Sequence, residues 1–249
     1  DAYQLSTRAE KQPDGTYILN GHKAYLTLGS LCDMVIVFAS TNPDVGRWGL
    51  SAFVVPTDVD GVERQPNREK MGMRTTPFGD ITLHDAVLPS TALIGMEGAG
   101  ASIFNAVLQV ERSFVFATGI GAIERQLDEA IRYAGERHQG GQPIGGYQAV
   151  SQRLADIKQQ HETARLFMYR AAIASVTGNG VAMSAALSKL VASETGMSAA
   201  LATASIHGAT GYVSEFEIER NVRDVIGGVV YSGTSDIQRN IIARLLGVG

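Results

Sequence analysis

The sequence predicts an α+β protein in which a small β-sandwich or β-barrel domain precedes an antiparallel helical bundle of the four-helix type. Up to about residue 92, short runs of β-branched and aromatic residues are separated by Gly, Pro, Asn and Asp. Beyond Gly100 the apolar residues recur with the helical period. The two patterns do not alternate, as they would in a βαβ fold. The 249 residues are enough for two domains, which we expect at 1–92 and 93–249.

The first domain opens with a predicted hairpin at Pro13-Asp14-Gly15. Proline presets one backbone angle, aspartate can bond its own backbone, and glycine accepts a positive φ. The composition then predicts strands at 17–27, 34–40, 50–56 and 81–88. Their short, even spacing is typical of an all-β unit.

The second domain begins with a predicted long helix, which runs from about Gly100 to Tyr133 without a proline. Gly140 and Gly141 end this pattern. A second long helix is expected from Tyr147 to a glycine stop at 178–180, and a third, rich in small residues, over 181–206. Short helices at 215–224 and 235–246 complete the predicted bundle.

Composition excludes several classes of function. A net charge of −4 without any basic run argues against nucleic-acid binding. The single cysteine, Cys32, excludes a disulfide framework, and the five histidines lack metal-ligand spacing, so we expect no metal site. No run approaches the roughly 18 consecutive apolar residues of a membrane span. We therefore expect a cytoplasmic protein that does not enter the membrane.

Glu111 is the first candidate for chemistry. It shares a helical stripe with Phe104, Val107 and Val115, so its carboxylate is expected to face the bundle interior. Burial raises the pKa of an unpaired carboxyl, which suits a general base near neutral pH. The alternative is a structural ion pair with an arginine of another helix.

The string from Val230 to Arg239 is the second candidate. It places a glycine turn before a helix, whose free N–H groups and dipole could bind a phosphate or a carbonyl oxygen. The alternative is an ordinary capping box formed by Ser235 and Gln238. Elsewhere the chain lacks the spacing of a Rossmann fingerprint, a P-loop or a nucleophile elbow.

Several strings together resemble the acyl-CoA dehydrogenase family of flavoproteins. In chain order they are Gly21-His-Lys-Ala-Tyr-Leu-Thr27, Lys70-Met-Gly-Met-Arg74, Asp85-Ala-Val-Leu-Pro89, Glu111-Arg112, Glu136-Arg137, Gln148, Leu154-Ala-Asp156, and Tyr231-Ser-Gly-Thr-Ser-Asp-Ile-Gln-Arg239. The resemblance spans nearly the whole chain. It implies a middle β domain and a C-terminal helical domain, and the start at Asp1 without Met leads us to expect that the family's N-terminal helical domain is missing.

The resemblance implies an FAD site. Thr27 matches a threonine that hydrogen-bonds the flavin, and Tyr25 stands where a tryptophan packs on the flavin ring. Arg137 matches an arginine that reaches the FAD of a neighbouring subunit, which implies a homodimer or homotetramer. The remaining implied cofactor residues are Gln139, Gln148, Thr234 and Asp236.

The resemblance also bears on the catalytic base. Most of the family carries its glutamate in a Tyr-Glu-Gly-Thr motif, whereas this chain has Ser232 there. A minority places it on the first bundle helix just before an arginine, as in Glu111-Arg112. This implies α,β-dehydrogenation of an acyl thioester, with Glu111 removing the α-proton and hydride leaving to the flavin. The implied substrate-binding residues are Arg112, Tyr231, Ser232 and Gly233.

The partners implied are an acyl thioester, carried by coenzyme A or an acyl carrier protein, and an electron-transfer flavoprotein or an equivalent acceptor. In a eukaryote the expected compartment would be the mitochondrial matrix. Two alternatives remain at this point. One is a non-catalytic, structural or assembly relative, and the other is a flavin oxidase or monooxygenase relative.

Overall fold

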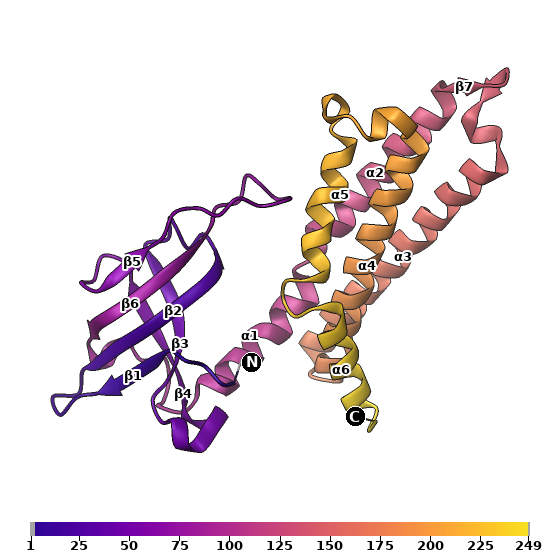
Figure 1. Ribbon diagram of the computed structural model, residues 1–249. Helices are drawn as coiled ribbons and strands as arrows, with labels where there is room; N and C mark the ends of the chain where they lie inside the picture. The colour runs from indigo at the N-terminus through magenta and orange to yellow at the C-terminus, as the bar shows by residue number, and fades with distance from the viewer. Residues whose placement is uncertain (1–2, 249) are drawn as a thin grey trace. The chain divides into compact units, whose positions relative to one another are not determined.

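The computed structural model describes residues 3–248, which form two compact units (Figure 1). The β unit contains the chain up to Lys70 together with Arg74–Val107. The helical unit contains Met71–Met73 and the chain from Leu108 onward. The α+β class is confirmed. The expected boundary between residues 92 and 93 lies between the last strand and the first helix, and it stays a prediction.

The β unit is a single sheet in the order β4-β3-β1-β2-β6-β5. Its strands are β1 (Arg8–Lys11), β2 (Tyr17–Thr27), β3 (Met34–Ser40), β4 (Leu50–Pro56), β5 (Val62–Arg64) and β6 (Phe78–Leu88). Neighbouring strands pair antiparallel, except β1 and β3, which pair in parallel. The short strands β1 and β5 carry too few residues to show a pattern, so the sequence did not predict β5 and predicted a strand at β1 only through the hairpin, without bounds.

The predicted hairpin joins β1 and β2. Lys11 pairs with Tyr17, and Gly15 has a φ of 89°. Within the turn, the carboxylate of Asp14 accepts hydrogen bonds from the backbone N–H and the hydroxyl of Thr16. The hydrogen bonds inside the turn therefore come from the residue types that predicted it.

The sheet curls around its own core. The rings of Tyr17 in β2 and Phe53 in β4 lie 5.0 Å apart, although β1 and β3 separate these strands in the sheet. In a flat sheet, three strand spacings would place them roughly 14 Å apart. The sheet is therefore barrel-like, with its buried side chains on the concave face.

Six α-helices lie in the described part of the chain, and the first of them begins in the β unit and continues into the helical unit. They are α1 (Gly100–Phe114), α2 (Ala117–Glu136), α3 (Gln148–Thr177), α4 (Val181–His207), α5 (Ile218–Ile226) and α6 (Ser235–Leu245). The prediction of one helix from Gly100 to Tyr133 is wrong, because the chain breaks at Val115 and Phe116. The apolar period continues across the break, so the sequence pattern does not reveal it.

Packing within the bundle shows the direction of its helices. One core layer joins Ile120, Ala164 and Ala192, and a second includes Ile123, Ile157 and Ala199. Residue numbers rise along α2 and α4 but fall along α3, so α3 runs antiparallel to both. The small residues of α4 let the neighbouring helices approach it closely.

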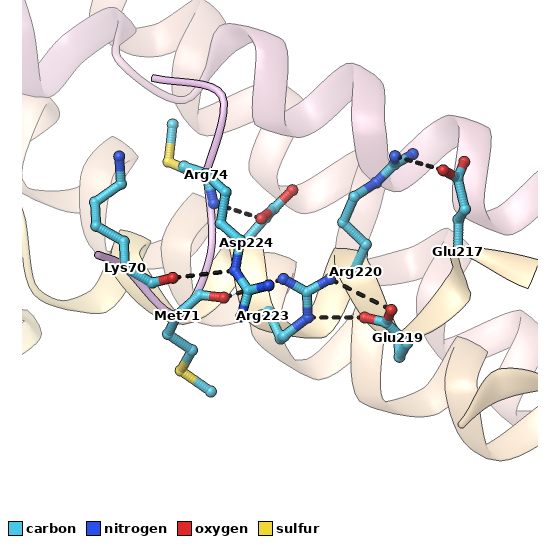
Figure 2. A network of polar contacts seen from close by, with 9 residues as sticks. Lys70, Met71, Arg74, Glu217, Glu219, Arg220, Arg223 and Asp224 are labelled. Carbon is cyan, nitrogen blue, oxygen red and sulfur yellow. Dashed lines mark hydrogen bonds and ion pairs between the residues drawn. The ribbon is translucent and has the colours of Figure 1, made fainter. Parts of the chain in front are cut away.

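A short segment, Met71–Met73, lies against α5 (Figure 2). The Arg223 guanidinium donates to the carbonyl oxygen of Met71 over 3.0 Å, and the backbone N–H of Met73 donates to the Asp224 carboxylate over 2.5 Å. A Cβ added at Gly72 would lie 2.2 Å from the Arg223 carbonyl oxygen. Only glycine fits between these contacts, which gives the Lys70-Met-Gly-Met-Arg74 string a packing function.

One apolar stretch qualifies by length and composition as a membrane-spanning helix. It is Gly100–Glu136, counted as a single element of 37 residues, with a mean hydropathy of 1.3 over its most apolar window. Only 17% of that window is buried. Helices of soluble proteins pass the same test, so the expectation that the protein does not enter the membrane stays a prediction.

Candidate active site

The break between α1 and α2 sets up the candidate site. It places Phe116 against the segment that follows α5, where the Phe116 and Tyr231 rings stack with centroids 5.5 Å apart and planes 7° from parallel. This contact joins the first two helices of the bundle to the Tyr231–Gly233 turn.

The Tyr231–Gly233 turn has an unusual backbone. Ser232 has a φ of 56° and Gly233 a φ of 84°. A Cβ at Gly233 would lie 2.8 Å from the Gln238 amide nitrogen, so glycine is required there for space as well as for conformation. A serine held in the left-handed region is strained, and surrounding contacts must hold it.

Arg112 and Gln238 supply those contacts. The Arg112 Nε donates to the carbonyl oxygen of Ser232 over 3.3 Å. The Gln238 amide, which is fully buried, donates to the carbonyl oxygens of Ser232 (3.3 Å) and Gly233 (3.0 Å). A charged donor on α1 and an amide donor on α6 thus hold the backbone carbonyl groups of the turn.

Glu111 faces the same turn. The Ser232 hydroxyl donates to the Glu111 Oε1 over 2.5 Å, across 121 residues of sequence. The structure therefore brings Glu111, Arg112, Tyr231, Ser232 and Gly233 into one cluster. Burial, with the nearby Glu111 charge as a second cause, raises the pKa of the Tyr231 phenol above its ordinary value.

The expected burial of Glu111 is wrong for this chain. Glu111 is exposed, and Val107 and Val110 on the same helix are 55% and 60% exposed. Apolar periodicity shows that one face of a helix is suited to burial, but it does not show what covers that face. Among the described contacts, the partner of the Glu111 carboxylate is the Ser232 hydroxyl. None of those contacts is the ion pair with an arginine of another helix that was the alternative.

The N-terminus of α6 follows the turn directly. Thr234 is the N-cap, and its side chain accepts a hydrogen bond from the backbone N–H of Ile237. The alternative of a capping box formed by Ser235 and Gln238 is therefore wrong, because Ser235 is already helical and the buried Gln238 amide donates to the turn. Asp236 is exposed and lies 3.6 Å from Arg239.

Tyr25 and Thr27 lie near the end of β2 in the β unit, and both are exposed. Tyr25 has a φ of 62°, and its backbone N–H donates to Asp80 over 3.0 Å. The Arg68 guanidinium lies 4.9 Å from the centre of the Tyr25 ring and forms a bidentate pair with Asp80. Buried Asp80 thus fixes both the backbone and one face of an aromatic ring that is 67% exposed.

Arg137, Gln139 and Gln148 lie elsewhere. All three are exposed around the loop between α2 and α3. Phe116 and Arg137 flank α2, whose 20 residues extend about 30 Å. Within one chain these residues are therefore not brought to the Glu111 cluster.

Sequence reasoning missed several residues of these clusters. Phe116 lies inside a continuous apolar pattern, the spacing of Gln238 also fits a capping box, and Asp80 belongs to no motif. Lys189 gave one signal, because it is the single lysine on a helix rich in small residues. Among the residues that the structure describes, no group of three or more His, Cys, Asp or Glu side chains could hold a metal ion.

Comparison with known proteins agrees with this architecture. Residues 1–86 match the middle domain of acyl-CoA dehydrogenase, and residues 98–247 match its C-terminal domain. An L-prolyl-(peptidyl-carrier protein) dehydrogenase of Pseudomonas fluorescens is 37% identical over 99% of this chain and 65% of its own length. An acyl-CoA dehydrogenase of Bacillus subtilis shows the same identity and coverage. The chain thus spans slightly less than two thirds of these relatives.

Solved structures give the same result. The prolyl acyl carrier protein oxidase AnaB superposes with a TM-score of 0.97 at 38% identity, over 99% of this chain and 65% of that one. Butyryl-CoA dehydrogenase from Megasphaera elsdenii gives 0.95 at 34% identity, over 99% and 64%. The chain belongs to the acyl-CoA dehydrogenase family.

Proposed function

We propose that the protein is an FAD-dependent dehydrogenase that removes the α- and β-hydrogens of an acyl thioester, with Glu111 as the base. The observation that carries this proposal is the contact between Glu111 and Ser232. It places a carboxylate beside a strained turn on the segment where most of the family carries its base. Family membership supplies the reaction class, and this contact supports the choice of Glu111 within it.

The chain's own groups have distinct functions in this proposal. The Glu111 carboxylate is exposed and accepts the α-proton. The backbone N–H of Ser232 has no acceptor among the described residues, so it can donate to the thioester carbonyl oxygen. Polarising that carbonyl is necessary because an unassisted α-carbon is too weak an acid for a carboxylate. Arg112 and Gln238 hold the N–H in place through the carbonyl groups of the turn.

The described residues fit the proposed cofactor. Arg68 lies on the Tyr25 ring, yet most of Tyr25 is exposed, so it can pack against a planar ring. At the start of α6 the Ser235 hydroxyl is buried and has no hydrogen-bond partner among the described residues. In the β unit, Tyr25 and Thr27 are the residues that we propose to contact the cofactor, and in the helical unit these residues are Thr234 and Asp236. When bound, FAD supplies the acceptor for the β-hydride.

The substrate class is an acyl thioester, carried by coenzyme A or by a carrier protein. The similar proteins include enzymes named for each kind of carrier. A caffeyl-CoA reductase complex subunit from Acetobacterium woodii, 35% identical, is named for its complex with Etf. We propose an electron-transfer flavoprotein or an equivalent acceptor as the partner, and a cytoplasmic location.

We also propose that the working form is a homodimer or homotetramer. Arg137, Gln139 and Gln148 lie on the loop between α2 and α3, about 30 Å along α2 from Phe116 and the Glu111 cluster. They could serve the cofactor site of a neighbouring subunit.

The test is anaerobic reduction of the purified yellow protein by acyl-CoA and acyl-carrier thioesters. We expect the flavin absorbance to bleach with one of them. Glu111→Gln should slow bleaching by at least about 10³-fold while FAD stays bound, because it removes the proton acceptor. Glu124→Gln, an exposed glutamate on α2, is the matched control and should bleach normally.

Three results would contradict the proposal. Bleaching that survives Glu111→Gln would reject Glu111 as the base. A protein that cannot be loaded with FAD would favour the structural or assembly relative. A thioester-reduced flavin that molecular oxygen reoxidises rapidly would favour the oxidase relative, and a flavin that no thioester reduces but that consumes oxygen and substrate once another donor has reduced it would favour the monooxygenase relative.

A further inference from the structure

Lys189 on α4 is a fully buried lysine close to the candidate site. None of its surface is exposed, and its neighbours along the helix are small residues such as Ala185, Ala186 and Ala192. Burying an ammonium group is costly unless it is paired. A helix rich in alanine and serine could have carried an uncharged residue at this buried position, so the charge requires an explanation.

The ammonium group of Lys189 points at one backbone carbonyl. Its Nζ donates to the carbonyl oxygen of Gly228 over 2.9 Å and lies 5.8 Å from the centre of the Phe116 ring. Among the described residues, no carboxylate oxygen lies within 4.0 Å of the Lys189 Nζ, so the ammonium group forms no ion pair. The strongest interaction of this buried cation is therefore with the backbone that precedes Tyr231.

Gly228, whose carbonyl oxygen accepts this hydrogen bond, has no space for a side chain. A Cβ added there would lie 2.8 Å from Phe116 and 3.7 Å from Ser193. Three residues later Tyr231 stacks on the same Phe116 ring. The segment that leads into the turn is thus held by Lys189 at one end and by the Phe116 ring at the other.

We propose that Lys189 is a positioning residue for the reaction, because it anchors the Gly228 carbonyl and so fixes the Tyr231–Gly233 turn that presents Ser232 to Glu111 and to the substrate. This inference rests on the proposed function. It adds a residue that touches neither substrate nor cofactor and acts through the turn. The neutral amine is a weaker donor than the ammonium, so the anchor depends on the proton of Lys189.

Burial and the charged groups around Lys189 set the pH at which it loses its proton. Burial, and after it the positive charge of Arg112 on α1, lower the pKa of Lys189 to about 8, while the negative charge of Glu194 on α4 opposes them. Glu194 is itself paired with Arg239 of α6 over 2.5 Å. Phe116 and Gly228, which lie next to the Lys189 ammonium group, carry no charge. The anchor is therefore expected to weaken above about pH 8.

Amide hydrogen exchange tests the anchor without turnover. In the FAD-loaded protein, Lys189→Met should make the peptide that covers residues 227–234 exchange at least about tenfold faster, since a hydrogen bond from a charged donor is lost. Lys158→Met, on the exposed face of α3, is the control and should change nothing there. Once the intrinsic pH effect is removed, the wild-type peptide should also loosen above pH 8, and the Lys189→Met peptide should not.

Kinetics provide the second measurement. Lys189→Met should lower kcat/KM about tenfold with FAD content unchanged, and the fall of wild-type kcat/KM above pH 8 should be missing from its pH profile. Lys189→Arg, which stays charged, should keep its rate at pH 9 closer to its rate at pH 7 than wild type does. Exchange and kcat/KM both within twofold of wild type would overturn the proposal. If no thioester reduces the wild-type protein, the proposed function fails, while the exchange measurement still decides the anchor.

Discussion

Single residues in this protein set the conformation of strained backbone. Asp80 is the clearest case in the β unit. Its carboxylate accepts bonds from Arg68, from the backbone N–H of Tyr25 and from a nitrogen of His22. These donors, with Arg68 foremost, hold the pKa of Asp80 well below its ordinary value. A group with a lowered pKa stabilises the folded state above its unfolded pKa and loses that effect as the pH falls.

Asp80→Asn should therefore lower the Tm by about 5 °C or more at pH 7, because Arg68 and the Tyr25 N–H lose their acceptor. The difference from wild type should shrink as the pH falls below about 4. Asp58→Asn, at an exposed position of the same unit, is the control. Thermal unfolding at pH 7 and pH 3.5 measures this, and an unchanged difference between the two pH values would show that Asp80 acts through packing instead.

Lys189 also has a lowered pKa, but here the folded state disfavours the charged form rather than stabilising it. Its pKa is lowered to about 8, so the unfolded state holds this proton more tightly than the folded state between pH 8 and about 10.5. The stability of wild type relative to Lys189→Met should therefore rise with pH over this range. The shift corresponds to at most about 3 kcal/mol. Urea unfolding of both proteins at pH 7.5 and pH 10 tests this, and parallel pH dependence would contradict it.

At the scale of elements, the contact of Met71–Met73 with α5 depends on one glycine. Gly72→Ala would place a Cβ 2.2 Å from the Arg223 carbonyl oxygen, so the segment or α5 must move. We expect a loss of about 1–3 kcal/mol in the free energy of unfolding.

Gly121→Ala is the matched control for this substitution. Gly121 lies within α2 with nothing within 4 Å of the added Cβ, so alanine should stabilise the protein by up to about 1 kcal/mol through helix propensity. Denaturant titration of both variants is the measurement. A neutral Gly72→Ala would mean that the segment does not require this close approach.

At the scale of the whole molecule, the proposed self-association can be tested on the outer face of α3. Leu166, Tyr169, Ile173 and Val176 recur with helical spacing and are 53–89% exposed. Ile173→Glu should shift the assembly towards smaller species, because it places a charge in an apolar contact. Gln152→Glu, also exposed on α3, is the control. Light scattering after size exclusion measures the mass, and an unchanged mass for Ile173→Glu would exclude this face from the interface.

The sequence alone determined much of this protein. The α+β class, the four longer strands and the main helices follow from local patterns, since period and turn chemistry act over a few residues. The Glu111-Arg112 and Tyr231-Ser-Gly-Thr234 strings identified the candidate site for the same reason: each is short and contiguous.

Only the tertiary structure decided how those strings are used. It broke the first bundle helix at Phe116, left Glu111 exposed, turned Gln238 inward, and brought Ser232 to a residue 121 positions away. It also placed Lys189 under the turn. Such contacts depend on which faces pack together. A periodic pattern shows only that one face is apolar, so neither the partners of these residues nor their burial could be predicted from it.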